Sequence, residues 1–314
     1  MRIVSADDIQ SVLTYRALID ALDEAFRADF AVPVRHHHTI DTEGADATLL
    51  VMPAWKEDGE RYIGCKIVTV FPDNAKIQRP SVYGQYLLLS GETGEPLAMM
   101  EGRALTAWRT ACASALAARY LAREDAAHLA MVGAGALAPH LIRAHLSVRP
   151  IRRVTLWNRT RARAVSLGFG IAVAGIEVDI AETAEEAVRE ADIISCATLA
   201  AQPLIRGAWL KKGAHLDLVG GFTPKMREAD DQAVKRARIF VDTRAGAAKE
   251  AGDIVVPLKK KIIDAKAIKG DLFDLCRGKV KGRTSASQIT LFKSVGTAIE
   301  DLAAAMLVWK SLSA

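Results

Sequence analysis

Residues 128–160 constrain the fold of this chain more than any other stretch, and they read HLAMVGAGALAPHLIRAHLSVRPIRRVTLWNRT. A short apolar run ends at Gly133-Ala-Gly135-Ala-Leu-Ala138, a helical pattern follows, and a second apolar run stops at Asn158. This order predicts a strand, a glycine turn, a helix and a strand, the context in which G-x-G-x-x-A binds a dinucleotide. Gly133 permits the tight turn, Gly135 admits a pyrophosphate to the backbone, and Ala138 lets the helix pack on its strand. The helix N-terminus adds partial positive charge for the phosphates. An ordinary strand-to-helix turn is the alternative.

The end of the second strand carries Asn158-Arg159-Thr160, with Arg161 and Arg163 close behind. A site for NAD usually has Asp or Glu at this corner, roughly 20 residues after the glycines, to hold the ribose hydroxyls. A carboxylate would repel a 2′-phosphate, whereas Asn and Thr donate to it and Arg neutralises it. We therefore expect NADP(H) to be preferred, with NAD(H) left open. A solvated basic loop is the alternative.

The composition indicates an ordinary globular protein of two domains. The chain has 314 residues, half of them hydrophobic and a quarter charged, with a formal net charge of +5. The basic residues form no stripe interleaved with aromatics, so we expect no nucleic-acid partner. Four widely spaced cysteines are typical of buried thiols in a reducing cytosol and predict neither disulfides nor a metal site. No leader and no apolar run of 18 residues are recognisable, so we expect a cytoplasmic protein with no membrane partner.

The first third of the chain predicts a sheet with helices beside it. Ser5 or Asp7 can cap a helix whose apolar spacing continues to Phe26. Apolar runs at 48–52, which ends at Pro53, and at 62–71, 81–89 and 96–100 then predict consecutive strands. Strands without helices between them indicate an antiparallel or mixed sheet. An Ala-rich helical pattern at 105–121 leads into the glycine-turn strand.

Downstream, strands and helices alternate. We expect strands at 177–180, 192–197, 215–219 and 238–242, and a helix over 183–190 in which Glu186 completes a capping box with Thr183. Apolar strands separated by helices indicate a parallel sheet covered on both faces. The pattern at 292–309 predicts one long helix that returns to the first domain. The predicted fold class is α/β: a Rossmann-type doubly wound parallel sheet over 126–296, and a second α+β domain with a mixed sheet over 1–125 and 297–314.

Three basic residues are candidates for the site. Lys66 lies inside an apolar strand, where lysine is rarely buried without a partner; it either faces outward or lies on a cleft floor against a carboxylate or a transferred proton. Arg109, among Ala and Trp in a helix, needs an anionic partner or covers the domain surface. Arg35 is a second candidate for binding an anion. Neighbouring residues of a strand point to opposite sides, so His36-His37-His38 cannot all bind one metal, and we expect no metal site. The chemistry is then expected to be that of the cofactor.

A series of blocks over almost the whole chain carries a family resemblance. They read LLVMPAW, GCKIVTVFPDN, LTAWRTACASALAARYLA, VGAGALA, LWNRT, ADIISCAT, HLDLVGGFTPKMREAD, VDTRAGAAKEAGD and GRTSASQITLFKSVGTAIEDLAAA. In this order the chain resembles the ornithine cyclodeaminase/mu-crystallin family. The resemblance implies a Rossmann domain, a sheet-based substrate and dimerisation domain, usually a homodimer, and an imine or amine substrate that bears a carboxylate.

The resemblance also implies roles for particular residues. Arg35, Lys66 and Arg109 match the substrate cleft, with Lys66 as the catalytic proton donor or acceptor. The residues that match cofactor contacts are Arg109, Thr110, Gly133, Gly135, Ala136, Leu137, Asn158, Arg159, Thr160, Thr198, Val219, Gly220 and Ser294.

Three departures from the family pattern bear on the activity. Cyclodeaminases have an acid directly after the Gly-Gly pair and another two residues before the Met-Pro, whereas this chain has Phe222 and Leu50. Without those carboxylates, a second ammonium group on the substrate would lack a counter-charge, which costs several kcal/mol when it is buried. Leu137 replaces a common Gln in the glycine turn.

We therefore predict an oxidoreductase that reduces a cyclic ketimine carboxylate with NAD(P)H. The expected substrate is the small cyclic imino acid Δ1-pyrroline-2-carboxylate, which gives proline, or the six-membered piperideine homologue, which gives pipecolate. Ornithine cyclodeaminase with bound NAD⁺ is the alternative within enzymes, and an alanine-type dehydrogenase stays open. A mu-crystallin-like protein that binds NADPH and a small ligand is the alternative from another class.

Overall fold

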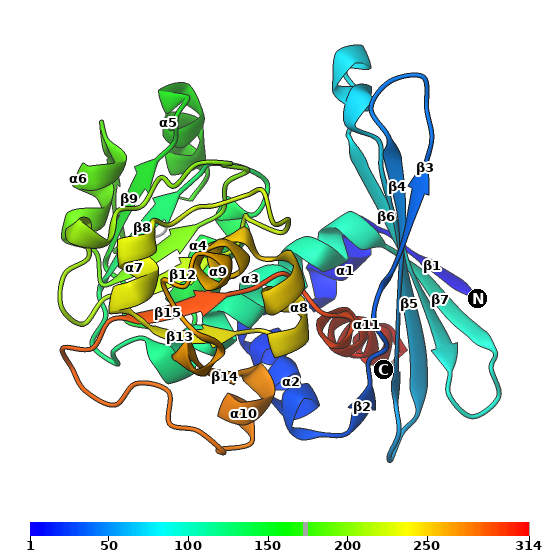
Figure 1. Cartoon of the computed structure of the whole chain (residues 1–314). Coiled ribbons are helices and arrows are strands. Elements are labelled where there is room, and N and C mark those ends of the chain that lie inside the picture. Colours follow the sequence, from blue (N-terminus) through cyan, green and yellow to red (C-terminus); the bar gives the residue numbers. More distant parts are fainter. Residues whose placement is uncertain (172–174, 314) are drawn as a thin grey trace. The chain divides into compact units, whose positions relative to one another are not determined.

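The computed structural model describes residues 1–171 and 175–313 and divides into two compact units (Figure 1). The first unit comprises Met1–Arg109 and Thr297–Ala314, and the second comprises Thr110–Gly296. The division between Arg109 and Thr110 falls inside helix α3 (Gly102–Leu121), whereas the sequence analysis placed it at 125/126. The other division lies between Gly296 and Thr297.

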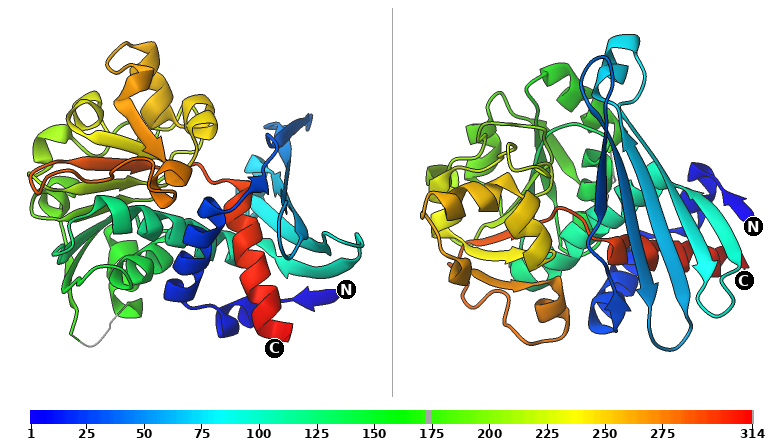
Figure 2. Two further views of the ribbon diagram at one scale, coloured as in Figure 1. Left: turned by 90° about the horizontal axis from the view of Figure 1, so that it is seen from below. Right: turned by 45° about the vertical axis from the view of Figure 1, so that its right-hand side comes forward.

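The first unit is built on a mixed, strongly twisted sheet (Figure 2). The strand order is β1-β7-β6-β5-β4-β2, and β3 also pairs with β4. Only the β1–β7 pair is parallel, which confirms the mixed sheet. The strands are β1 (Arg2–Val4), β2 (Phe30–Ala31), β3 (His36–Ile40), β4 (Ala47–Lys56), β5 (Tyr62–Val70), β6 (Val82–Ser90) and β7 (Pro96–Glu101), with a 3₁₀ turn at Pro72–Ile77.

Strand β4 passes through Pro53, where the sequence analysis ended it. Pro53 pairs with Cys65 of β5 on one side. On the other side β3 pairs with β4 only as far as Val51, and β2 pairs only with Trp55 and Lys56. The missing N–H of Pro53 therefore falls in the gap between β3 and β2, where no neighbouring strand needs a donor.

Three whole helices and the start of α3 complete the first unit, and two of the three were predicted as one. α1 (Ala6–Val12) is capped by Ser5. The chain breaks at Leu13 and restarts as α2 (Tyr15–Arg27), where Thr14 accepts from the backbone N–H of Ala17 at 3.2 Å. The apolar spacing continues through this region, but Thr14 acts as a second N-cap, so one helix ends and another begins here. The C-terminal helix α11 (Ala298–Ser313) packs on α2 and on β4, β5 and β6.

The predicted helix over 292–309 was wrong at its start. Thr290–Lys293 form β15, a fully buried strand of the second unit that pairs with β12 and β13. Gly296 then adopts a left-handed conformation with φ of 82°, and the helix begins at Ala298. A short apolar run bounded by a glycine reads equally well as a buried strand or a helix end, and here the strand pairing decides.

The second unit is an all-parallel sheet of order β10-β9-β8-β11-β12-β15-β13-β14. Every residue of β11, β12 and β15 is buried, so both faces of these strands are covered, as predicted. The strands are β8 (His128–Val132), β9 (Arg153–Trp157), β10 (Glu177–Ile180), β11 (Ile193–Cys196), β12 (His215–Leu218), β13 (Arg238–Val241) and β14 (Ile268–Asp271). The chain runs outward from β8 in both directions, which makes β8 and β11 the switch point of a doubly wound sheet.

The helices of the second unit lie between its strands in the chain. Beside the larger part of α3, they are α4 (Ala138–Leu146), α5 (Arg161–Gly170), α6 (Ala184–Arg189), α7 (Asp231–Arg236), α8 (Arg244–Glu250), α9 (Gly252–Lys259) and α10 (Leu272–Cys276), with 3₁₀ turns at Gly207–Trp209 and Ala265–Ala267. Thr183 caps α6 as predicted, accepting from the N–H of Glu186 at 3.1 Å. The Glu186 carboxylate accepts from Glu182 N instead of Thr183 N, so the predicted capping box is only half formed.

Candidate active site

Lys66 lies on the buried face of β5. Along this strand Tyr62, Gly64 and Lys66 are buried, while Ile63 and Ile67 are exposed, because side chains alternate between the two faces. The Lys66 residue is only 3% exposed. The Lys66 side chain therefore points into the interior of the unit. A buried ammonium group requires an anionic partner.

Two acids at the start of α11 supply that partner. The Asp301 Oδ2 atom lies 2.7 Å from Lys66 Nζ, and its Oδ1 atom accepts from Arg109 Nε at 3.0 Å. Glu300 Oε2 accepts from Arg109 Nη1 at 2.6 Å. Both acids have no exposed surface and lie in the first turn of the helix, where a negative charge is favoured. Strand β5, helix α3 and helix α11 thus bring together what we call the Lys66 cluster: Lys66, Arg109, Glu300 and Asp301.

Burial and charge set the ionisation of this cluster. Burial lowers the pKa of Lys66 to about 8, against the Asp301 carboxylate, which raises it. Burial would raise the pKa of Asp301, but the charges of Arg109 and Lys66 outweigh this and hold that pKa below its usual value. Lys66 is consequently a cation that can release its proton near neutral pH, which is the property of a general acid.

Tyr86 lies beside Lys66 on the neighbouring strand β6, as its cross-strand partner. Its hydroxyl is buried and has no hydrogen-bond partner among residues 1–171 and 175–313. Burial, reinforced by the Asp301 charge, raises the pKa of Tyr86 well above its ordinary value, so the group stays a neutral donor. A Cβ atom at Gly64 would lie 1.8 Å from the Tyr86 hydroxyl oxygen, so the glycine makes room for the ring.

The charges of the Lys66 cluster cancel, since two cations face two carboxylates. The sequence predicts the two cations, Lys66 and Arg109, but not Glu300 and Asp301. The available signal was a pair of adjacent acids in an otherwise apolar, Ala-rich helix. Arg35, half-buried just before β3, is the third predicted cation, and its charge lowers the pKa of Lys66. The structure therefore brings the three predicted cations within electrostatic range of one another.

In the second unit, the glycine turn after β8 has the form that a pyrophosphate needs. Gly133 has φ of 104°, and a Cβ atom there would lie 2.6 Å from the Ala197 carbonyl oxygen. A Cβ atom at Gly135 would meet nothing within 4 Å, so this glycine leaves open space beside the backbone. Leu137 occupies the N-cap of α4 and makes no side-chain capping bond. The turn thus fits the phosphates of a dinucleotide.

A cavity of about 320 Å³ adjoins this turn. It is lined by Gly133, Ala134, Gly135, Trp157, Asn158, Arg159, Thr160, Arg163, Ala197, Thr198, Leu199, Ala200 and Leu204. Among these described lining residues none is acidic, and two are arginines. The Asn158 amide connects the glycine turn to the segment after β9. Its Oδ1 accepts from Ala134 N at 3.1 Å, and its Nδ2 donates to the Thr160 carbonyl at 2.9 Å. Ala136 lines an adjoining hollow next to Gly135.

The other predicted cofactor contacts lie where the parallel strands end. Thr198 follows β11, Val219 and Gly220 follow β12, and Ser294 follows β15. The Val219 N–H donates to Cys196 and the Ser294 N–H to Leu218, so these strand ends are neighbours. Thr110, the first residue of the second unit, is buried in α3.

Glu228, which the sequence analysis missed, holds two of these strand ends together. Its Oε1 accepts from the Thr198 N–H at 2.7 Å and from the Thr198 hydroxyl at 2.8 Å, and its Oε2 accepts from the Gly220 N–H at 2.8 Å. Glu228 has no exposed surface. Burial raises its pKa to about 7, against the charge of Lys293, which lowers it. One buried carboxylate therefore positions the backbone after β11 and after β12.

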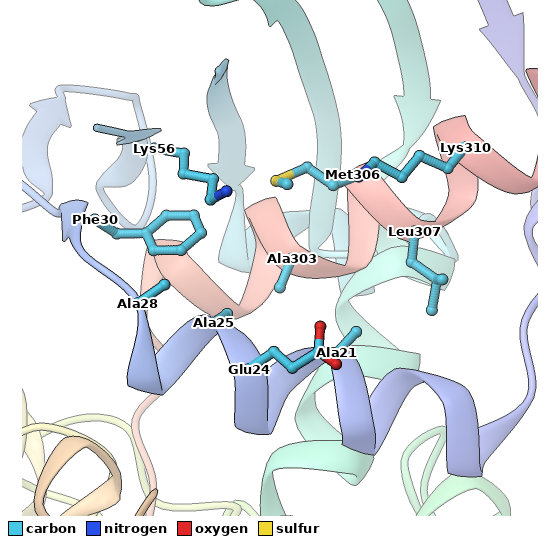
Figure 3. A pocket seen from close by; sticks show the side chains of 10 residues that line it. All are labelled: Ala21, Glu24, Ala25, Ala28, Phe30, Lys56, Ala303, Met306, Leu307 and Lys310. Atoms are coloured by element: carbon cyan, nitrogen blue, oxygen red, sulfur yellow. The ribbon is translucent and has the colours of Figure 1, made fainter. Parts of the chain in front are cut away.

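A further cavity of about 330 Å³ lies in the first unit between α2 and α11 (Figure 3). It is lined by Ala21, Glu24, Ala25, Ala28, Phe30, Lys56, Ala303, Met306, Leu307 and Lys310. Four of these are alanines, too small to fill the space between two helices. Lys56 is paired with Asp58 at 3.7 Å, and Lys310 is paired with Glu60. The cavity contains none of the predicted site residues, and small side chains explain it.

Within residues 1–171 and 175–313, no group of three or more His, Cys, Asp and Glu side chains is arranged to bind a metal ion. The exposed His36 and His38 rings stack at 6.3 Å on one face of β3, and His37 alternates to the other. In the same part of the chain no helix has the length and apolar character needed to cross a membrane.

A parallel sheet with a glycine turn at its switch point, joined to a unit that buries a cation–carboxylate cluster, defines a Rossmann-type α/β protein with a second, mixed-sheet unit. The chain belongs to the ornithine cyclodeaminase/mu-crystallin family, whose model matches residues 1–314.

Relatives and solved structures agree with this membership. An uncharacterised protein of Schizosaccharomyces pombe is 44% identical over 98% of this chain and 96% of its own length. A Δ1-pyrroline-2-carboxylate reductase of Colwellia psychrerythraea is 39% identical over 100% of both chains. The Δ1-pyrroline-2-carboxylate reductase of Thermococcus litoralis, solved with NADH and L-proline, is 34% identical with a TM-score of 0.94, covering 100% of this chain and 98% of the other. An archaeal alanine dehydrogenase dimer with bound NAD is 29% identical with a TM-score of 0.91, covering 100% and 96%.

Proposed function

We propose that this protein reduces a cyclic ketimine carboxylate with a nicotinamide dinucleotide, and that Δ1-pyrroline-2-carboxylate, which gives proline, is the substrate. The observation that carries the proposal is the Lys66 ammonium group, buried 2.7 Å from Asp301 and with a pKa of about 8. A donor of this kind protonates an imine nitrogen at neutral pH. The relatives named as Δ1-pyrroline-2-carboxylate reductases support the choice of reaction.

The first unit then binds and protonates the substrate. Arg35, a guanidinium group whose charge reaches Lys66, holds the substrate carboxylate. Lys66 transfers a proton to the ring nitrogen, which makes the C=N carbon electrophilic. A reduced dinucleotide held at the glycine turn by Gly133 and Gly135 would supply the hydride that this carbon takes up. The C=N bond thereby becomes a CH–NH bond, and Lys66, left neutral, regains its proton from water.

The chain lacks the residues that a cyclodeaminase uses on the side-chain amine of ornithine. Phe222 and Leu50 stand at the two positions of the family's acids. The acids that the structure does bury in the first unit, Glu300 and Asp301, are engaged by Arg109 and Lys66. A second ammonium group would therefore be bound without a counter-charge, which is unfavourable by several kcal/mol.

NADP(H) is the proposed cofactor in preference to NAD(H). Arg159, Thr160 and Arg163 line the cavity beside the glycine turn, with no acid among the described lining residues. Guanidinium groups bind the 2′-phosphate of NADP(H) through two parallel, charge-assisted hydrogen bonds. The 2′-hydroxyl of NAD(H) is uncharged and cannot form such a pair of bonds.

One assay panel separates this function from its alternatives. NADPH and NADH oxidation are followed with pyrroline-2-carboxylate, with piperideine-2-carboxylate, and with pyruvate plus ammonia. We expect the fastest turnover with pyrroline-2-carboxylate and NADPH. Ammonia released from ornithine without added cofactor would instead identify a cyclodeaminase, turnover only of pyruvate with ammonia an alanine-type dehydrogenase, and binding of NADPH with no turnover a mu-crystallin-like protein.

The exposed face of the first sheet supports a homodimer. Trp55, Ile63, Ile67 and Tyr83 are 38%, 36%, 44% and 44% exposed, and they come from three adjacent strands. A continuous apolar face of this kind marks a contact with another chain. We expect the protein to have twice the chain mass in light scattering, and Ile67→Lys to yield monomers. Ile77→Lys, at an exposed residue outside the strands, is the control and keeps the dimer.

We also propose that the protein works in the cytosol. All four cysteines are free thiols, and three of them are buried, which suits a reducing compartment.

A further inference from the structure

The Asp301 carboxylate spans two cations in the interior of the first unit. One of its oxygens contacts Lys66 on β5, and the other contacts Arg109 on α3. We propose that Asp301 is a positioning residue, which keeps the Lys66 ammonium group charged and fixed in direction for proton delivery. This inference rests on the proposed reduction.

The geometry leaves Lys66 dependent on this carboxylate. The lysine side chain has four rotatable bonds, and Asp301 is the acid that contacts its ammonium group. Asp301 itself cannot move far, because it has no exposed surface and lies in the first turn of α11, a helix packed on β5. A rigid carboxylate at one end of a flexible lysine therefore fixes the position of its nitrogen.

The other groups that face Lys66 give no replacement for the negative charge. Arg109 from α3 and Arg35 from the segment before β3 are cations, and both lower the pKa of Lys66. Tyr86 on β6 stays neutral, and the opposite partner on β4 is Met52. Removing the Asp301 charge leaves a buried ammonium group beside two guanidinium groups, and such a group releases its proton readily.

Glu300 provides a matched control. It is the neighbouring residue of the same helical turn, equally buried, and its carboxylate binds the same arginine at 2.6 Å. The groups that set the pKa of Lys66 are Asp301, Arg109 and Arg35. Glu300→Gln therefore removes one buried charge from the Lys66 cluster without removing the partner of Lys66.

The first experiment measures the pH dependence of kcat/KM for pyrroline-2-carboxylate at saturating NADPH. The wild-type enzyme is expected to lose activity as the pH rises through about 8. In Asp301→Asn this loss shifts to lower pH by about one unit or more, the usual effect of removing an adjacent opposite charge. In Glu300→Gln it stays within about 0.3 units of the wild type, an expectation that follows from the same dependence on adjacent charge. An unshifted profile in Asp301→Asn, or equal shifts in both variants, overturns the proposal.

A second variant separates charge from position and serves if Asp301→Asn does not fold. Asp301→Glu keeps the charge but moves the carboxylate by one methylene. We expect its pH profile to stay near that of the wild type while kcat falls about ten-fold or more, as misplaced catalytic groups do. A variant with unchanged kcat contradicts a positioning role. Thermal melting and NADPH titration establish that each variant is folded.

A measurement without turnover distinguishes failure of this inference from failure of the proposed function. Protein labelled with [ε-¹³C]lysine is titrated by NMR, and the Lys66 signal is assigned by its loss in Lys66→Arg. Lys66 is expected to titrate near pH 8 in the wild type and in Glu300→Gln, and lower in Asp301→Asn. If the titrations differ as expected but no cyclic imine is reduced, the role of Asp301 stands and the substrate assignment is wrong. Identical titrations in all three proteins reject the role of Asp301 whatever the reaction is.

Discussion

The Lys66 ammonium nitrogen lies 2.7 Å from the Asp301 carboxylate, with the two side chains 4% and 0% exposed. Lys66 belongs to β5, a middle strand of the sheet, and Asp301 belongs to the C-terminal helix α11, which packs on that sheet. Burying either charge alone would be unfavourable by several kcal/mol, so each group is stable only with the other. The pair consequently joins the last helix of the chain to the sheet of the first unit and holds a proton donor in the interior of that unit.

Lys66→Met is expected to remove turnover and to leave the dinucleotide bound. The thioether chain fills a similar volume but cannot donate a proton, and loss of a general acid lowers rates by about 10²- to 10⁴-fold. NADPH affinity should stay within about two-fold, since every residue that lines the cavity beside the glycine turn belongs to the second unit. Fluorescence titration with NADPH checks this, and lost affinity would contradict the role assigned to Lys66.

Arg159→Ala is expected to reduce the preference for NADPH over NADH about ten-fold, the effect of losing one charge-assisted contact to a phosphate. Arg159 lines the cavity beside the glycine turn. Arg161→Ala is the control, because Arg161 is paired with Glu182 at 2.9 Å and is not among the lining residues. KM values for both cofactors provide the measurement. Equal losses with NADPH and NADH would place Arg159 on the phosphates that the two cofactors share.

Glu228→Gln is expected to loosen the strand ends that it joins. One carboxylate oxygen becomes an NH₂ group, which then faces the N–H donors of Thr198 or Gly220. Losing a buried bond to a charged acceptor lowers the free energy of unfolding by about 2 kcal/mol. We also expect the dissociation constant for NADPH to rise about ten-fold, as for a misplaced binding group. Urea unfolding tests the loss of stability, and NADPH titration tests the loss of affinity. An unchanged dissociation constant in a destabilised variant would show that Glu228 stabilises the fold but does not position the cofactor site.

His215 is expected to make the second unit sensitive to acid. Burial, with smaller contributions from nearby cationic groups, lowers its pKa from 6.5 to about 3, although Asp217 opposes the shift. Between pH 6.5 and pH 3, His215 is therefore protonated in the unfolded chain but stays neutral in the folded chain. Stability from this group is complete above pH 6.5 and is lost as the pH falls toward 3.

Urea unfolding of the wild type and His215→Gln at several pH values measures this effect. Between pH 6.5 and pH 5 the wild type should lose about 2 kcal/mol more than the variant, at about 1.4 kcal/mol for each pH unit. Parallel curves for the two proteins would show that His215 does not carry the acid sensitivity.

Local patterns predicted most of the fold, because their causes are local. The glycine turn at Gly133 and Gly135 depends on backbone conformation and the space beside one turn. The parallel and mixed sheets followed from whether helices separate the apolar strands. The errors lie where one pattern allows two structures: the strand at Phe292 was assigned to a helix, and a second cap at Thr14 was overlooked.

The site was predictable only in part. A lysine inside an apolar strand and an arginine among alanines are visible along the chain, so Lys66 and Arg109 were found. Their partners were not, since a carboxylate neutralises a cation across space and leaves no spacing in the sequence. Glu300, Asp301 and Glu228 therefore had no recognisable role before the strands and helices were assembled.

Residue order alone was enough to specify a dinucleotide-type turn, the family and an unusual lysine, because each depends on neighbours along the chain. Whether that lysine faces water or the interior, and which acid balances its charge, depended on the packing of α11 on β5. Electrostatic interactions in a low-dielectric interior act over a few ångströms whatever the separation in the chain, so the ionisation of Lys66 is a property of the folded unit.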